Sequence, residues 1–308
     1  MNEINLSYVI TTHNKLPYLK EVMKQLLENV KEDEEIVVVD GASKDGTVEY
    51  LTELYQQGKI HQFISEPDKG EAHGYNKAML MAKGELIKLI TDDDVFYYPG
   101  IQECKRFMLE HPEVDVLGTQ GGMISISPVE AVIYLEYYND WLFTTKPFAF
   151  CGLGLLLRQK SLALTGLFHT GFIRVDAEFS YRITSGKINL AWYTGLVWLH
   201  NGNPQSNSAK YSTQMEIEMN KLEQLYLDKP FSKNASYWKK SKTSVIQLLK
   251  KVPLLVRIKR FIFPIKFTKH TSNNQTLELS NKFDFGYNWL VNANRERKSD
   301  FLHKGLNR

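Results

Sequence analysis

The sequence predicts an α/β fold in which helices cover both faces of an open, mostly parallel sheet. Apolar runs typical of buried parallel strands alternate with segments of helical periodicity through the first hundred or so residues. Polar clusters directly follow these runs, and ligands of open α/β sheets bind outside the carboxyl ends of the strands. These two observations predict both the fold class and the edge of the sheet at which a site would form.

Each element is predicted from its own pattern. The expected elements are strands at 6–12, 36–39, 60–65 and 85–91, and helices at 16–27, 47–57, 72–83 and from Pro99 onward. Pro99 suits the first turn of a helix, where a missing N–H costs little. Asp45 is expected to cap the helix at 47–57. Residues 114–207 have a less regular, aromatic-rich pattern and are expected to complete the same domain with an acceptor pocket.

The composition indicates a folded protein without a disulfide framework. Of the 308 residues, 43% are hydrophobic and 24% charged, which excludes wholesale disorder and fibrous folds. The two cysteines exclude a four-cysteine zinc site and suit a reducing compartment. The N-terminus lacks a secretory pattern and no run of 18 apolar residues is present, so we expect a cytoplasmic protein.

The charge distribution predicts two regions, residues 1–228 and residues 229–308. Residues 229–277 contain twelve Lys and Arg and no Asp or Glu, whereas the rest of the chain is net acidic. We therefore expect a basic helical C-terminal extension on an acidic catalytic domain. Within it, residues 243–263 form a basic amphipathic pattern that suits an anionic membrane surface, here the inner face of the plasma membrane. The alternative is a helix that docks on the domain, and the acidic body argues against nucleic acid.

Asp92, Asp93 and Asp94 follow the fourth expected strand directly. Adjacent carboxylates repel one another, so a cation or solvent must relieve the repulsion. Carboxylate oxygens are the ligands that Mg²⁺ and Mn²⁺ prefer, so one interpretation is a divalent metal site that also contacts a diphosphate. The alternative is a solvated acidic turn that precedes the next helix.

Further polar residues lie at the ends of the other strands. Asp40 ends an apolar strand, where it either contacts a ribose or base or orders the following turn. Asp68 and Lys69 lie in a turn that would present a cation and backbone N–H groups to a phosphate. The residues expected to flank the same ligand after the first strand are Thr11, His13 and Lys15.

Asp176 and Glu178 are the candidates for proton transfer. They lie two residues apart between apolar and aromatic neighbours, and a partly buried carboxylate can serve as a general base. Arg182 lies one helical turn from Glu178, so their spacing favours an ordinary ion pair and leaves Asp176 as the first candidate.

In order and together, these pieces resemble the inverting glycosyltransferase family 2, which has a GT-A fold. The resemblance covers roughly residues 5–205 and rests on YVITTHNK, EIVVVDGASKDGT, SEPDKGEAHGYNKAMLMAKGE, LIKLITDDDVFYYPG and RVDAEFSYRI. It implies a nucleotide-diphosphate-sugar donor, a Mg²⁺ or Mn²⁺ ion near Asp92–Asp94, and a glycan or lipid-linked acceptor. The family's catalytic base usually sits in a Glu-Asp pair, and Val175-Asp176 occupies that place here. The resemblance also offers His200 as a neighbour of the metal or diphosphate, although a solvated loop histidine is the favoured interpretation.

Two other functions compete with this interpretation. A nucleotidyltransferase would use a similar sheet, but TTHNK lacks the glycine of its usual phosphate loop. A non-catalytic, membrane-associated scaffold would keep the fold and the nucleotide motifs without the reaction. The chain has no GxGxxG, GxxxxGK[ST] or GxSxG motif, which argues against dehydrogenases, P-loop enzymes and serine hydrolases.

Overall fold

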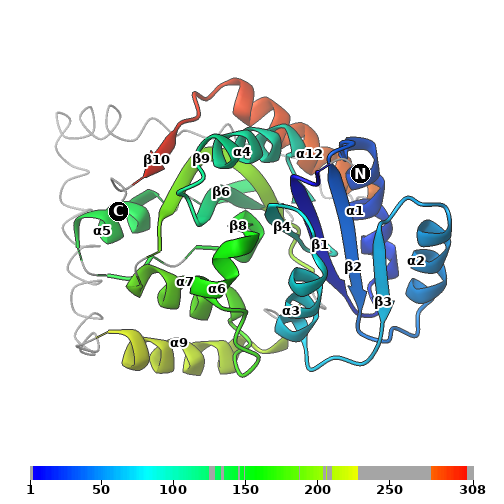
Figure 1. Ribbon diagram of the computed structural model, residues 1–308, viewed down its shortest axis with the longest axis horizontal. Helices are drawn as coiled ribbons and strands as arrows, with labels where there is room; N and C mark the ends of the chain where they lie inside the picture. Colours follow the sequence, from blue (N-terminus) through cyan, green and yellow to red (C-terminus); the bar gives the residue numbers. More distant parts are fainter. Residues whose placement is uncertain are drawn as a thin grey trace, which may run out of the picture.

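Figure 1 shows the computed structural model of the chain. It describes residues 3–124, 129–132, 135–144, 146–148, 150–186, 188–203, 206, 210–227 and 279–303. The segment 243–263, for which a membrane contact is expected, lies outside the described residues. Within the described residues, no helix is both long enough and apolar enough to cross a membrane.

A single mixed sheet runs through the molecule. Its strand order is β10-β9-β6-β8-β4-β1-β2-β3, with β5 pairing with β9 and β7 with β6. The strands are β1 (Leu6–Thr12), β2 (Glu34–Asp40), β3 (Gln62–Ser65), β4 (Leu86–Ile90), β5 (Val95–Phe96), β6 (Val116–Ile124), β7 (Val129–Val132), β8 (Leu156–Arg158), β9 (Leu190–His200) and β10 (Phe301–His303). The neighbours among β1–β4 pair in parallel, while β8 is antiparallel to both β4 and β6. The expected α/β class is confirmed.

Helices cover both faces of this sheet (Figure 1). They are α1 (Leu16–Asn29), α2 (Thr47–Gln56), α3 (Glu71–Met81), α4 (Tyr98–Glu110), α5 (Leu135–Phe143), α6 (Leu162–Thr165), α7 (Val175–Ser185), α9 (Ser212–Tyr226) and α12 (Leu279–Arg295). One hydrophobic core contains side chains of α1, α2, α4 and α12. The other core contains side chains of α3, α5 and α7. α9 packs on α7 through Leu222 and forms an additional layer.

The apolar run of β2 shows why the parallel strands lack an alternating pattern. Ile36 and Val38 point into the first core, whereas Val37 and Val39 point into the second. Successive side chains of a strand alternate between faces, so a strand covered by helices on both sides must be apolar throughout. All seven residues of β2 are buried.

Asp45 links the starts of two helices. Its carboxylate accepts hydrogen bonds from the Thr47 N–H at 3.2 Å and the Leu16 N–H at 2.9 Å. The first N–H groups of a helix lack partners within the helix, so an acceptor there stabilises the helix start. Asp45 therefore stabilises the start of α2 as expected, although the N-cap residue is Gly46, and the same side chain also serves α1.

Residues 279–303 return to the sheet. Phe283 and Leu290 of α12 are fully buried in the first core. β10 extends the sheet as the antiparallel neighbour of β9. The expected extension over 229–308 therefore includes a part that packs with the α/β domain, because α12 carries an apolar face. The expected boundary between residues 228 and 229 lies outside the described residues and stays a prediction.

Candidate functional site

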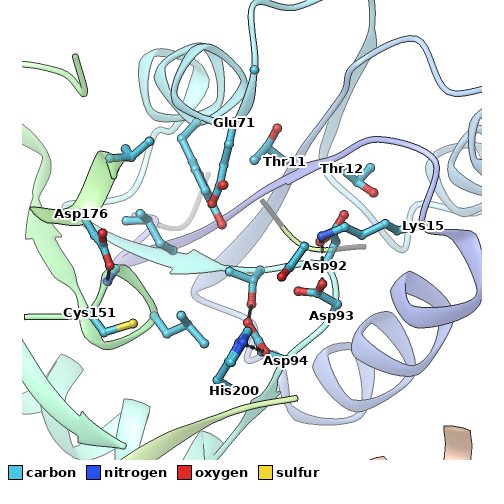
Figure 2. A pocket seen from close by; sticks show the side chains of 18 of the residues that line it. Thr11, Thr12, Lys15, Glu71, Asp92, Asp93, Asp94, Cys151, Asp176 and His200 are labelled. Atoms are coloured by element: carbon cyan, nitrogen blue, oxygen red, sulfur yellow. Dashed lines mark hydrogen bonds and ion pairs between the residues drawn. The ribbon is translucent and has the colours of Figure 1, made fainter. Parts of the chain in front are cut away.

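A cavity of about 580 Å³ opens at the carboxyl ends of β1 and β4. Its lining includes Asp92, Asp93 and Asp94 after β4, the segment Thr11–Lys15 at the end of β1, and Asp176 on α7. Figure 2 shows these side chains around one space, with Asp176 on the opposite side from Asp92. The expected convergence of polar groups at this edge of the sheet is confirmed.

The ammonium group of Lys15 lies between two carboxylates of the acidic triplet. Its Nζ donates to Asp92 Oδ1 at 2.8 Å and to Asp93 Oδ2 at 2.9 Å (Figure 2). Asp93 Oδ2 also accepts a hydrogen bond from Asn203 Nδ2 at 2.9 Å. All three aspartates are at most 5% exposed, so these contacts replace water around the carboxylates.

Asp94 faces the end of β9. Its Oδ1 accepts from the Asn201 N–H at 2.7 Å and lies 2.9 Å from Nδ1 of His200, while its Oδ2 accepts from the Thr91 hydroxyl at 2.7 Å. Lys282 of α12 donates to the Asn201 carbonyl at 2.7 Å, which connects the C-terminal helix to this corner of the cavity. His200 thus contacts the acidic triplet through Asp94, and its role beside a metal stays a prediction.

The pKa values of Asp93 and Asp94 are shifted in opposite directions. Burial and the charges of Asp94 and Asp92 raise the pKa of Asp93 to about 6, against the effect of Lys15. Burial also acts to raise the pKa of Asp94, but the hydrogen bond and charge of His200 and the hydrogen bonds of Thr91 and the Asn201 N–H together outweigh burial and leave the pKa below its usual value. The same hydrogen bond raises the pKa of His200. Burial acts to lower the pKa of Lys15, but Asp92 and Asp93 outweigh it and raise that pKa.

The wall on the side of β1 is closely packed. A Cβ added to Gly74 of α3 would lie 1.9 Å from Oγ1 of Thr11, so only glycine lets α3 approach this strand. His13 Nδ1 lies 2.9 Å from the Gly41 carbonyl oxygen, and Asp68 Oδ1 accepts from the Gly70 N–H at 2.9 Å. Thr11, His13 and Asp68 line the cavity, as expected for residues that flank the ligand in the sequence analysis.

Three of the expected site residues do not line the cavity. Asp40 is fully buried and accepts hydrogen bonds from the Ser43 N–H at 2.9 Å and the Ser65 hydroxyl at 2.6 Å, which is the turn-ordering alternative. The Lys69 N–H donates to the ring of His73. Glu178 pairs with Arg182 at 2.9 Å and accepts from the Tyr226 hydroxyl at 2.7 Å. The structural ion pair expected for Glu178 is confirmed.

Asp176 is held by backbone groups at the start of α7. Its Oδ1 accepts from the Ala177 N–H at 2.8 Å, and its Oδ2 from the Gly152 N–H at 3.2 Å. Gly152 belongs to a 3₁₀ turn, Gly152–Gly154, that also lines the cavity. These two contacts fix the direction of a carboxylate that still faces the cavity.

The cavity also contains residues that the sequence analysis did not single out. Glu71 begins α3 and points into the cavity between Asp176 and Asp92 (Figure 2). Lys210 and Met215 line the cavity from the chain that follows β9. Glu71 lies inside the segment SEPDKGEAHG, so its place in that motif was the available signal. Lys210 and Met215 lie beyond the sequence motifs, and no pattern in the sequence pointed to them.

An acidic cavity at the carboxyl edge of an open α/β sheet, closed by a second, mixed half, is the arrangement expected of a GT-A glycosyltransferase. Residues 7–160 match the model of Glycosyl transferase family 2, and the chain belongs to that family.

Relatives and solved structures agree with this assignment. The chain is 23% identical over 241 residues to an uncharacterised glycosyltransferase of Nostoc sp., an alignment covering 70% of this chain and 71% of that protein. It is 26% identical over 106 residues to the putative teichuronic acid biosynthesis glycosyltransferase TuaG of Bacillus subtilis, covering 34% of this chain and 42% of TuaG. A crystal structure of S. aureus TarS with UDP-GlcNAc has a TM-score of 0.58 at 16% identity, covering 94% of this chain and 81% of that one.

A second solved structure is the mannosyltransferase PcManGT of Pyrobaculum calidifontis with GDP-Man and Mn²⁺. It has a TM-score of 0.53 at 18% identity, covering 70% of this chain and 61% of that one. The likeness to both structures shows the fold. The chain spans less than half the length of some relatives, including 18% of a Rickettsia conorii glycosyltransferase.

Proposed function

We propose that the protein is an inverting glycosyltransferase that moves a sugar from a nucleotide-diphosphate donor to a hydroxyl group of a glycan or lipid-linked acceptor. The observation that carries this proposal is the position of Asp176 across one cavity from Asp92–Asp94. A displacement that inverts an anomeric carbon needs a base on one side of the sugar and the departing diphosphate on the other. The cavity offers that separation.

Asp176 acts as the general base in this proposal. It accepts the proton of the acceptor hydroxyl while the hydroxyl oxygen bonds to the anomeric carbon and the bond to the diphosphate breaks. The backbone N–H groups of Gly152 and Ala177 hold the carboxylate in place. Such positioning lowers the entropy cost of bringing the reacting groups together.

Asp92 and Asp93 would hold a divalent cation, Mg²⁺ or Mn²⁺. Their oxygen donors suit a hard cation, and the Lys15 ammonium already stands between them as a positive charge. A cation bound there supplies electrostatic stabilisation of the leaving diphosphate. Thr11, His13, Lys15 and Asp68 are proposed to contact the donor from the neighbouring wall.

The name of TuaG supports a role in the assembly of surface polysaccharide. Attachment of residues 243–263 to the inner face of the plasma membrane would suit a lipid-linked acceptor. Both statements stay predictions, as does the cytoplasmic location.

Asp176→Asn tests the proposed base. The amide keeps the size of the side chain but cannot take the proton, so transfer should fall about 10²- to 10⁴-fold, while donor binding stays unchanged. Transfer and release of nucleotide diphosphate are measured with UDP- and GDP-sugars, and binding by calorimetry.

Asp140→Asn is the matched control, because Asp140 is exposed on α5 and does not line the cavity. Unchanged transfer in Asp176→Asn would rule out Asp176 as the base. Donor binding without transfer by the wild-type protein, with any acceptor offered, would favour the scaffold alternative.

A further inference from the structure

The Lys15 ammonium occupies the place between Asp92 and Asp93 in which a cation would bind. Lys15 directly precedes α1, and its side chain is 20% exposed, against 7% and 6% for the two aspartates. Two contacts below 3 Å to two carboxylates are strong, charge-assisted hydrogen bonds. The acidic triplet therefore has an internal counter-ion at this position.

Asp93 and Asp94 make further contacts besides those of Lys15. Asn203 donates to Asp93, while His200, Thr91 and the Asn201 N–H contact Asp94. Accordingly, in the part of the chain that the structure describes, no three His, Cys, Asp or Glu side chains form a ready-made metal site. A metal ion that binds between Asp92 and Asp93 therefore competes with the Lys15 ammonium for these two carboxylates.

We propose that Lys15 is a built-in competitor of the divalent cation and leaves Asp92 and Asp93 only when a nucleotide diphosphate offers its ammonium a new partner. This inference rests on the proposed donor class. Moving a largely buried ammonium away from both carboxylates without a replacement would leave an unpaired charge, which is costly. A diphosphate in the same cavity supplies negative oxygens to Lys15 and further oxygen ligands for the cation.

Binding of the metal and of the nucleotide is consequently cooperative. Each should strengthen the binding of the other by the same factor, because coupling between two ligands is reciprocal. In the absence of the nucleotide, Asp92 and Asp93 stay paired with Lys15 and the protein binds metal weakly.

The test measures Mn²⁺ binding to the full-length protein by electron paramagnetic resonance, with and without UDP or GDP. Wild-type protein should bind Mn²⁺ at least about tenfold more tightly with the nucleotide than without it. Lys15→Met should bind Mn²⁺ alone at least about tenfold more tightly than wild type and show a smaller effect of the nucleotide, because the competing charge is gone.

Two further variants make the result specific. Lys15→Arg keeps the positive charge and should bind Mn²⁺ alone as weakly as wild type. Lys44→Met removes an exposed lysine that does not line the cavity and should also behave as wild type. Circular dichroism confirms that each variant is folded, and Lys15→Gln replaces Lys15→Met if that variant is not.

Two results would overturn the inference. One is equal Mn²⁺ affinity of wild type and the uncharged Lys15 variant in the absence of nucleotide. The other is a wild-type Mn²⁺ affinity that UDP and GDP leave unchanged although they bind. If neither nucleotide binds with any metal, the proposed donor class is wrong, whereas the comparison with Mn²⁺ alone still decides the role of Lys15.

Discussion

Lys88 is a charged residue in the interior of the sheet. It lies on β4, is 0% exposed, and its Nζ donates to the Leu153 carbonyl and lies 5.0 Å from the centre of the Phe96 ring. Burial lowers the pKa of Lys88 to about 7. Leu153 belongs to the 3₁₀ turn that also holds Asp176, so Lys88 connects the central strand to the wall of the cavity.

Lys88→Met should change how stability depends on pH. Unfolded Lys88 keeps its proton up to about pH 10.4, whereas the folded group loses it near pH 7, so the unfolded state binds more protons above pH 7. The unfolding free energy of wild type relative to Lys88→Met should therefore rise with pH from 7 to 8.5, by about 1.4 kcal/mol per pH unit. Below pH 7 the difference should be constant.

Urea denaturation at several pH values between 6 and 8.5 measures this difference. Comparing two proteins cancels the other titrating groups, whose environment the substitution leaves in place. Parallel pH profiles would contradict a neutral Lys88 in the folded state.

Some residue contacts follow from local spacing and others do not. The pair of Glu178 and Arg182 was predictable because residues four apart on a helix are neighbours. The contact of Lys15 with Asp92 joins residues 77 positions apart, and only the parallel pairing of β1 with β4 brings them together. The sequence could place both residues at one edge of the sheet without showing that they pair.

At the scale of elements, the approach of α3 to β1 determines the shape of the cavity wall on the side of β1. Both elements were expected from their patterns, and α3 begins at Glu71, one residue earlier than predicted. Their close contact depends on Gly74, which faces Thr11. Periodicity predicts that a helix forms but not how near it comes to its strand, since that distance depends on side-chain volume.

Gly74→Ala should destabilise the protein and weaken donor binding together. The added methyl group would lie 1.9 Å from Thr11 Oγ1, so α3 or Thr11 has to move. Overpacking of this kind costs about 1–3 kcal/mol. Thermal denaturation measures the stability change, and calorimetry with UDP and GDP the binding.

Gly186→Ala is the control, because a Cβ there would meet its neighbours at an ordinary 3.6 Å. A Gly74→Ala variant as stable as wild type would show that α3 and Thr11 can move apart without cost. The close contact of α3 with β1 would then not determine the shape of the cavity wall.

For the whole molecule, the parallel half was predictable and the mixed half was not. The structure confirms the strand and helix patterns of residues 6–91, with shifts of one or two residues at several element ends, such as the third strand, which begins at Gln62. From Val116 onward, short strands pair antiparallel as well as parallel, and β9 has a register shift opposite Thr119 and Gln120. One apolar run does not specify which distant strand it will pair with.

The position of α12 in the core gives a test of the domain organisation. Phe283→Ala removes a fully buried ring of α12 and should cost about 3–5 kcal/mol of unfolding free energy. Asp284→Ala, at an exposed position of the same helix, should change stability by no more than about 0.5 kcal/mol. Chemical denaturation of both variants distinguishes a docked helix from an independent one, for which the two substitutions would have similar small effects.

Because the chain returns to the sheet with α12 and β10, the basic segment 229–277 cannot be tested by simply truncating the protein. α9 ends at Tyr226 and α12 begins at Leu279, and both helices pack on the domain, so the segment between them is joined to one body at both of its ends. A stop codon after residue 228 would strip α12 from the first core and uncover β9, and any loss of activity would report on folding. Excising the stretch with a short designed connection between Leu227 and Leu279 would isolate its own contribution to lipid or acceptor contact.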